Sequence, residues 1–264
     1  MDKKTLSKEI YKRFNVVKRA RNCFLYTKKE IRLTDLYQEN GRAILGWDAG
    51  DAFTQFKNTL NRGVTGFYQT EDKSRLKKAV SQLFNSQRDL FFFSNKADAL
   101  KAGLLISPES SSMYKPWQPY NTDWTKIKSI VIEPPFPWTD SIYILAVDSE
   151  LCTDETSFQQ EIQLPFPLQV GITRAIYNLI KAIEVRQEKD WFIYDTVLTK
   201  YWTRKGPYLY PKVPEEKYDE FIIHCLDCGV IINPDYNQPS IIPYGADKGV
   251  FTTLKNKPFI FQER

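Results

Sequence analysis

Four consecutive apolar residues, Leu90-Phe91-Phe92-Phe93, constrain the fold of this chain more than any other feature. They stand between polar residues, a pattern typical of a strand that is buried on both faces of a sheet. The sequence that follows predicts a short helix over 97–105 and two strands over 129–133 and 142–148. This order of elements predicts a small α/β layer with at least some parallel pairing. The stretches 108–119 and 149–163 are predicted to be loops, in the places where crossover connections would lie.

The clearest helix covers 168–188, because apolar residues recur there at spacings of three or four: Leu168, Ile172, Ile176, Leu179 and Ile183. Further helices are predicted over 4–19, from an Asp51 cap to Gly63, after a cap at Asp72 or Ser74, over 191–202, and from Pro214 to Gly229. Both chain ends also carry strand patterns. They predict a hairpin over 22–35 that turns at Lys28-Lys29, and short strands over 230–232 and 240–242.

The composition indicates a folded globular chain, since 42% of its 264 residues are apolar and it holds 17 Phe, 15 Tyr and 6 Trp. No apolar run approaches the ~20 residues that cross a bilayer, and the basic N-terminus has no signal-peptide core. Four Cys without a regular framework suit a reducing compartment. We therefore expect a cytoplasmic protein with no membrane partner.

Positive charge is concentrated in one stretch, although the net charge is only +5, from 37 Lys and Arg against 32 Asp and Glu. No acidic residue interrupts the basic residues between Lys12 and Lys29. The interpretation we favour is a solvated face of a helix and of the turn after it. Attraction for phosphate is the alternative. A basic nucleic-acid-binding protein therefore stays open as a hypothesis, although nucleic acid is not the partner we expect.

The single histidine, His224, stands beside Cys225 and close to Cys228, which invites a zinc or thiol-redox interpretation. On the predicted helix Cys225 faces the core, whereas His224 and Asp227 face away. The other cysteines form no second pair, so we predict no metal site and assign Cys225 and Cys228 to the core and the helix end. The sequence also holds no Gly-x-Ser-x-Gly elbow, no Walker loop and no GxGxxG segment, which argues against serine hydrolases and common nucleotide folds.

Asp148 is the best single polar candidate for a binding role, because it directly follows the strand over 142–148, with Glu150 close behind it. Open α/β folds place ligands at the carboxyl ends of their strands. Two neighbouring carboxylates are also a possible acid–base pair. The alternative interpretation is a solvated loop acid.

Five segments carry a family resemblance: the opening hairpin with the run Gly41-Arg42-Ala43-Ile44-Leu45-Gly46, Leu90 to Asn95 with the helix after it, Ile130-Val131-Ile132-Glu133-Pro134, 165–183 and 218–234. In this order they resemble fold-type-I pyridoxal-phosphate (PLP) aminotransferases, nearest to class III with its ornithine and 4-aminobutyrate transaminases. The resemblance implies an α/β architecture with a reduced central sheet flanked by helices over 65–189. It implies a small α+β domain from both chain ends, 1–64 with 190–264. It also implies a homodimer, since that family builds its sites across a two-fold interface.

The same resemblance implies three cofactor-binding residues. Ser94 and Asn95 match the segment that cradles the cofactor phosphate in that family, and Asp148 matches the residue that pairs with the pyridine nitrogen. Two departures matter. Lys96 leads straight into a helix where the family has a Ser-Gly-Ser/Thr run, and no lysine lies between Asp148 and Arg174, where the Schiff-base lysine is expected. Without that amine, PLP has no internal aldimine.

We therefore interpret the chain as a shortened, degenerate relative of these transaminases. It would be a non-catalytic or altered module that binds a small molecule or a protein, with no cofactor expected and no catalytic residue assigned. The alternative is a PLP-dependent transaminase that uses another lysine, Lys96 or Lys248.

Overall fold

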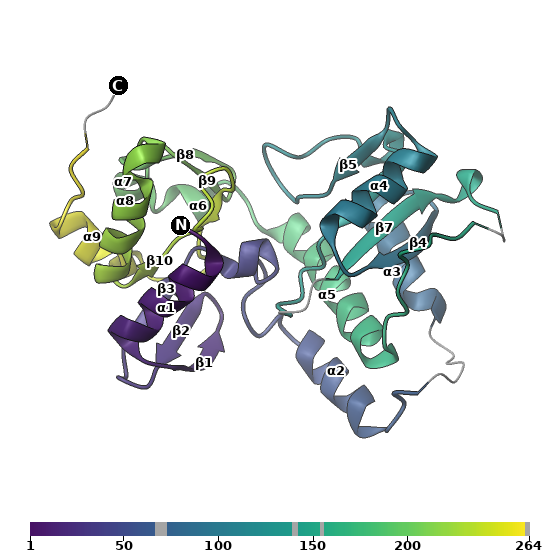
Figure 1. Ribbon diagram of the computed structural model, residues 1–264, viewed down its shortest axis with the longest axis horizontal. Helices are drawn as coiled ribbons and strands as arrows, with labels where there is room; N and C mark the ends of the chain where they lie inside the picture. Colours follow the sequence, from purple (N-terminus) through teal and green to yellow (C-terminus); the bar gives the residue numbers. More distant parts are fainter. Residues whose placement is uncertain (67–72, 139–141, 154–155, 262–264) are drawn as a thin grey trace. The chain divides into compact units, whose positions relative to one another are not determined.

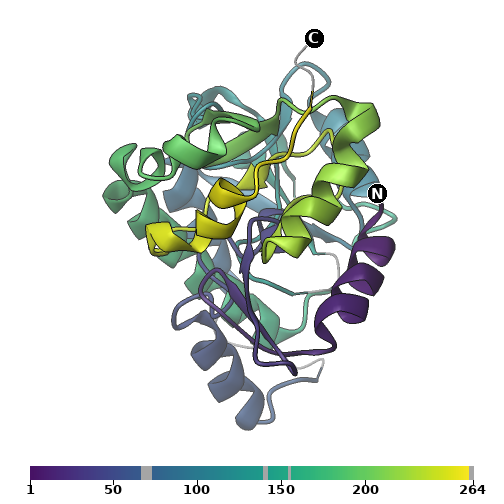
Figure 2. The ribbon, with the colours of Figure 1, turned by 90° about the vertical axis from the view of Figure 1, so that its left-hand side faces the viewer.

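The computed structural model describes residues 1–66, 73–138, 142–153 and 156–261. The chain divides into two compact units, a terminal unit of Met1–Asp48 with Arg186–Arg264 and a central unit of Ala49–Val185. The purple N-terminal and the yellow C-terminal segments therefore belong to one unit (Figures 1 and 2). The family resemblance implied boundaries between the two domains at 64/65 and 189/190. The difference at the first boundary arises because the helix over Ala52–Asn61 packs along the long helix of the central unit.

The central unit is built on a four-stranded sheet in the order β4-β7-β6-β5. Its strands are β4 (Arg88–Phe93), β5 (Ser111–Met113), β6 (Ser129–Ile132) and β7 (Tyr143–Asp148). The strands predicted around 90–93, 129–133 and 142–148 are thus confirmed. The expected parallel pairing occurs between β5 and β6, whereas β7 runs antiparallel to both β4 and β6.

Side chains cover both faces of this sheet, as the apolar run in β4 predicts. On one face Phe91, Phe93, Leu145 and Val147 form a buried cluster with alanines of α4 (Lys96–Ile106). On the other face Ile130, Ile144 and Ala146 are fully buried. Alternate residues of a strand point to opposite faces, so a strand in this position needs apolar residues at nearly every place.

Three further helices complete the central unit: α2 (Ala52–Asn61), α3 (Lys73–Phe84) and α5 (Phe166–Val185). The helix α5 confirms the periodicity over 168–188, and both α2 and α3 pack along it. Asp51 is the residue before α2, as predicted, but its side chain does not make the predicted hydrogen bond to the start of that helix. The Asp51 side chain makes no cap bond and instead accepts hydrogen bonds from Arg174 and Asn178 of α5. Of the two caps considered for α3, Ser74 lies inside the helix and Asp72 lies outside the described residues. Short 3-10 turns η2 (Trp124–Lys126) and η3 (Ser149–Leu151) precede β6 and follow β7.

The terminal unit contains two small sheets. The first has the order β1-β2-β3-β10, and the second has the order β11-β9-β8. The strands are β1 (Val17–Arg21), β2 (Phe24–Thr27), β3 (Arg32–Asp35), β8 (Trp202–Lys205), β9 (Tyr208–Pro211), β10 (Val230–Ile231) and β11 (Ser240–Ile241). The β2–β3 hairpin, β10 and β11 confirm the strands predicted at the two chain ends.

The remaining elements of the terminal unit are helical: α1 (Lys3–Phe14), η1 (Gln38–Gly41), α6 (Lys189–Phe192), α7 (Asp195–Leu198), α8 (Glu215–Asp227), η4 (Lys248–Phe251) and α9 (Thr252–Asn256). In α8, Cys225 is fully buried and Cys228 forms the C-cap, followed by Gly229 at φ +77°. Both cysteines therefore have the positions that the sequence pattern assigned to them.

Two predicted helices of this unit are wrong in part. The helix over 4–19 ends at Phe14, because Asn15 adopts a positive φ of 65° and Val17 already begins β1. The helix over 191–202 is split into the single turns α6 and α7, and Trp202 starts a hairpin that turns at Gly206. In both places the apolar spacing is helical, but a neighbouring strand supplies the pairing that decides the backbone.

Candidate functional site

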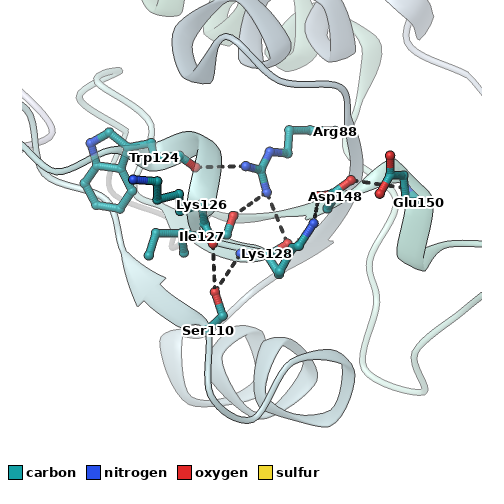
Figure 3. Close-up of polar contacts among 8 residues, drawn as sticks. All are labelled: Arg88, Ser110, Trp124, Lys126, Ile127, Lys128, Asp148 and Glu150. Atoms are coloured by element: carbon teal, nitrogen blue, oxygen red, sulfur yellow. Dashed lines mark hydrogen bonds and ion pairs between the residues drawn. The ribbon is translucent and has the colours of Figure 1, made fainter.

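Asp148, the last residue of β7, lies in a cluster of charged and backbone groups at one end of the central sheet (Figure 3). One of its carboxylate oxygens accepts a hydrogen bond from Lys128 Nζ at 2.6 Å. The other accepts from the backbone N–H of Glu150 at 3.2 Å. Only 9% of Asp148 is exposed. Its carboxylate is therefore held by this chain's own donors.

Both members of this ion pair have shifted pKa values. Burial by itself raises the pKa of Asp148, but the Lys128 ammonium, the Glu150 N–H and the Arg88 charge outweigh it and leave that pKa below its ordinary value. The hydrogen bond and charge of Asp148 raise the pKa of Lys128. At neutral pH the pair is therefore an ammonium and a carboxylate, and a protonated amine is a poor nucleophile.

Arg88, the first residue of β4, is the strongest polar feature near this cluster, and the sequence pattern did not point to it. Its side chain is fully buried. Its guanidinium donates to three backbone carbonyls, those of Trp124 at 2.9 Å, Ile127 at 2.6 Å and Lys128 at 3.1 Å (Figure 3). Burial lowers its pKa, and the Asp148 charge acts in the opposite sense. Arg88 therefore fixes the segment that leads into β6, and nothing local in the sequence distinguishes it from an exposed arginine.

Ser94 and Asn95 follow the other end of β4, where α4 begins. Asn95 is the N-cap, and its Oδ1 accepts from the Asp98 backbone N–H at 2.9 Å. Its Nδ2 donates to the Asp98 carboxylate at 2.5 Å. The start of α4 thus carries its own cap and its own negative charge, whereas Ser94 is exposed. A first-turn carboxylate satisfies the same partial positive charge that would attract a phosphate.

The structure does not bring the three predicted cofactor residues together. In the antiparallel β4–β7 ladder Arg88 pairs with Asp148, and Phe93 pairs with Tyr143. Ser94 is six residues beyond Arg88, which at about 3.3 Å per residue places it roughly 20 Å from the Asp148 end. The argument that selected Asp148 assumes parallel strands, whose carboxyl ends share one edge. Because β7 is reversed, its carboxyl end meets the amino ends of β4 and β6 instead.

These residues do not fit a bound PLP. A phosphate at the start of α4 would meet the Asp98 carboxylate, and a pyridine nitrogen at Asp148 would compete with Lys128. Lys96 lies at the Ser94 end of the sheet, as the first residue of α4. Lys248 belongs to the terminal unit and starts η4. The lysine that contacts Asp148 is Lys128, which is neither of these two. Its raised pKa keeps it protonated.

A cavity of about 280 Å³ lies elsewhere in the central unit, where α2, α3 and α5 meet. Its lining residues are mostly polar and include two guanidinium groups: Gln55, Arg75, Gln169, Val170, Thr173, Arg174 and Tyr177. Arg174 also binds the Asp51 carboxylate, with Nε and one terminal nitrogen at 2.7 and 2.6 Å. The Asp51 hydrogen bond raises the pKa of Arg174, and the same bond lowers the pKa of Asp51. The cavity therefore places an Arg174–Asp51 ion pair and the Arg75 guanidinium beside hydroxyl and amide groups.

His224, Cys225 and Cys228 lie at the C-terminal end of α8. His224 Nε2 lies 2.8 Å from the backbone oxygen of Lys257 and 3.8 Å from Cys228 Sγ. Within the part of the chain that the structure describes, no three His, Cys, Asp or Glu side chains gather in a metal-binding arrangement. In that same part, no helix combines the length and apolar character needed to cross a bilayer.

Comparisons with known proteins give the fold and leave the activity open. No protein-family model matches the chain. A relative from Treponema pallidum is 25% identical over 89% of this chain and 91% of its own length, and one from Borreliella burgdorferi is 24% identical over 94% and 92%. Both are described as uncharacterized proteins.

Solved structures are similar across nearly the whole chain. An ornithine aminotransferase from Plasmodium yoelii has a TM-score of 0.66 at 12% identity, over 91% of this chain and 93% of its own. An acetylornithine aminotransferase from Elizabethkingia anophelis has 0.64 at 8%, over 91% of each chain. An omega-transaminase from Sphaerobacter thermophilus has 0.64 at 9%, over 90% of each. The chain has an aminotransferase-like, PLP-transferase fold. At these identities the likeness extends to the fold and no further, since one fold hosts many functions.

Proposed function

We propose that this chain is a non-catalytic protein on an aminotransferase-like fold, which binds a small anionic molecule and does not use PLP. The observation that carries this proposal is the separation of Asp148 from Ser94 and Asn95 by the antiparallel β4–β7 ladder. A cofactor that needs a phosphate cradle and a carboxylate at its ring nitrogen would have to contact both ends of one strand pair.

The local contacts support the same conclusion. Asp98 brings a carboxylate to the start of α4, and Lys128 neutralises Asp148. Asn95 and Asp148 therefore already have partners from this chain. The absence of lysine between Asp148 and Arg174 removes the expected covalent anchor as well.

The cavity between α2, α3 and α5 is the ligand site in this proposal. Its volume of about 280 Å³ is large enough for a small metabolite. Arg174 keeps its paired hydrogen bonds to Asp51, so in this proposal Arg75 contacts the anion and Arg174 with its amide and hydroxyl neighbours shapes the rest of the site. Tyr177 and Thr173 add hydroxyl groups that would orient the rest of the ligand.

Calorimetric titration with 2-oxoglutarate, glutamate, succinate and inorganic phosphate tests the ligand site. We expect saturable binding of at least one of these anions, weakened about tenfold by Arg75→Gln, because the loss of one charged hydrogen-bond partner is worth about 1.5 kcal/mol. The matched control is Lys57→Gln on α2, which removes the same charge from an exposed position outside the cavity lining. Equal weakening in both variants, or no binding of any anion, would refute the site.

Parallel titration with PLP tests the cofactor half of the proposal independently. A PLP complex that survives dialysis would contradict it whatever the anions do. The homodimer stays a prediction, which light scattering at micromolar concentration tests: a monomer would contradict it. The cytoplasmic location likewise stays a prediction.

A further inference from the structure

The first sheet of the terminal unit has one face that combines arginines with aromatic rings. In its antiparallel registers Arg19 pairs with Tyr26, Tyr26 with Arg32, and Arg21 with Phe24. Directly paired residues lie on the same face of a sheet, and so do residues two apart along a strand. These five side chains therefore share one face, which we call the arginine–aromatic face.

The opposite face of the same strands is the core side. Leu25 pairs with Leu33, and Leu33 is fully buried. On the arginine–aromatic face the three arginines are exposed, whereas Phe24 and Tyr26 are half-buried. The face is thus solvated and yet carries two large rings in a fixed position.

The arginines stack on the rings. The Arg19 guanidinium carbon lies 4.3 Å from the centroid of the Tyr26 ring, and that of Arg32 lies 4.5 Å from the centroid of the Phe24 ring. Such cation–π contacts hold the planar guanidinium groups close to the sheet and leave their N–H groups available to solvent. The result is a surface of guanidinium groups supported by rings across three adjacent strands, which lie about 4.8 Å apart.

The charge of this face is unbalanced. Lys18 and Lys28 are its neighbours in the sequence, and in the stretch from Lys12 to Thr34 the one acidic residue is Glu30, in the turn between β2 and β3. Across residues 1–66, 73–138, 142–153 and 156–261, no carboxylate pairs with any of the five cations Lys18, Arg19, Arg21, Lys28 and Arg32. By contrast, Arg13 in the same basic stretch is bound to Glu9 and Asp227.

We propose that the arginine–aromatic face binds single-stranded nucleic acid. Unpaired bases stack on guanidinium planes, which the rings of Tyr26 and Phe24 support from below here, and a positively charged surface follows the phosphate backbone. The face offers both within the antiparallel β1–β2–β3 part of one sheet, whose outer strand, β1, is an edge strand. A duplex keeps its bases stacked on one another and would use only the charges.

A lipid surface fits the face less well. Interfacial binding needs apolar side chains that insert among the acyl chains. Here the two rings are half-buried and lie beneath arginines, so no apolar group protrudes from the face. The inference is independent of the anion cavity and of the question of PLP, because it concerns other residues.

Fluorescence anisotropy with a short labelled oligouridylate or oligothymidylate tests the proposal on the full chain. We expect saturable binding at low salt, with log K falling linearly as log salt rises and a slope set by about 0.7 for each phosphate contact. The double variant Arg19→Gln with Arg21→Gln should reduce that slope by about 1.4. The control is Lys200→Gln with Lys255→Gln, which removes the same charge from exposed positions elsewhere in the terminal unit and should leave the slope unchanged.

A second pair of variants separates stacking from charge. Tyr26→Leu keeps an apolar contact but removes the ring, so the affinity should fall about fivefold or more without a change in the salt slope. Arg19→Lys keeps the charge and removes the planar group, so the affinity should again fall about fivefold or more without a change in the salt slope. Far-ultraviolet circular dichroism and the urea midpoint establish that each variant is folded.

Four results of the binding and control experiments would overturn the proposal, and a fifth comes from Tyr26→Leu. The four are no binding of either oligonucleotide at low salt, equal losses in the face and control variants, equal or tighter binding of a duplex of the same length, and co-sedimentation with phosphatidylserine vesicles in preference to oligonucleotide. Indifference of the affinity to Tyr26→Leu would also refute it, because the surface would then be a charge patch without stacking.

Discussion

Asp148 lies directly opposite Arg88 in the backbone register of the antiparallel β4–β7 ladder. This register puts Asp148 at the end of the sheet opposite to Ser94. The two residues that the sequence joined into one cofactor site are therefore separated by the length of a strand. At the Asp148 end the chain has an ion pair and a buried guanidinium, and at the Ser94 end it has a self-capped helix. At both ends the polar groups bond to other groups of this chain, and these contacts stabilise the fold.

The buried guanidinium of Arg88 predicts a large stability effect. Arg88→Met keeps an unbranched apolar stem but leaves the carbonyls of Trp124, Ile127 and Lys128 without their donor. Because an unsatisfied buried polar group costs about 1–3 kcal/mol, we expect a loss of about 3 kcal/mol or more in the free energy of unfolding, measured by urea denaturation. The control is Lys101→Met at an exposed position of α4, expected within about 0.5 kcal/mol of the parent. An Arg88→Met protein as stable as the control would contradict the role given to Arg88.

The Lys128–Asp148 pair predicts a modest coupling that depends on pH. A double-mutant cycle of Lys128→Gln and Asp148→Asn should give a small favourable coupling at pH 7, because Lys128 is partly exposed and solvent screens the pair. The folded-state pKa of Asp148 is lowered, so this contribution is present above the unfolded value of about 4 and is lost as the pH falls through the folded value. Coupling that persists unchanged in strong acid would count against the ion pair.

The cap of α4 predicts a difference between two substitutions at one position. Asn95→Ala removes the acceptor of the Asp98 N–H and should cost about 1 kcal/mol in the free energy of unfolding. Asn95→Ser keeps an acceptor oxygen and should cost much less. Thermal denaturation of both variants makes the comparison. Equal losses would mean that the Asn95 side chain does not act as the cap.

Burial of Asp35 predicts a second pH effect with the opposite sign. Desolvation raises the pKa of Asp35 to about 6, although the backbone N–H of Gln38, the indole of Trp47 and the N–H of Tyr37 act against it. The folded protein therefore holds this proton more tightly than the unfolded chain, whose value is about 4. Stability should rise as the pH falls from about 6 to about 4, by about 2 kcal/mol for this group alone.

Comparison with Asp35→Asn isolates the Asp35 contribution from that of other carboxyl groups. The variant has no group to titrate at this position, so the free energy of unfolding of the parent should rise relative to that of the variant between pH 6 and pH 4. Two curves that stay parallel over this interval would show that Asp35 ionises in the folded protein as it does in the unfolded chain.

Local patterns predicted much of this fold because they report burial. The apolar run of β4, the strands that became β6 and β7, and the periodicity of α5 all depend on which side of an element faces the core. Those elements are present, with ends displaced by a few residues. The α8 helix and its stop at Gly229 follow from the same local logic.

The candidate site could not be predicted in the same way, because it depends on strand order. Nothing in residues 143–148 states that β7 inserts between β4 and β6 in the reverse direction, and that direction decides which end of the sheet Asp148 occupies. The burial of Arg88 has no local signature either. The sequence shows the basic stretch but not the arginine–aromatic face. Only the β1–β2–β3 register shows that Arg19, Tyr26 and Arg32 form one row.

The central claim, that this aminotransferase-like fold works without PLP, is tested most directly by borohydride reduction. The full chain is incubated with PLP, dialysed, reduced and analysed by peptide mass spectrometry, which locates any lysine that had formed a Schiff base. We predict no visible absorbance after dialysis and no stoichiometric adduct, with at most sparse modification spread over exposed lysines. One fully modified lysine, with a visible absorption band that survives dialysis, would contradict the account.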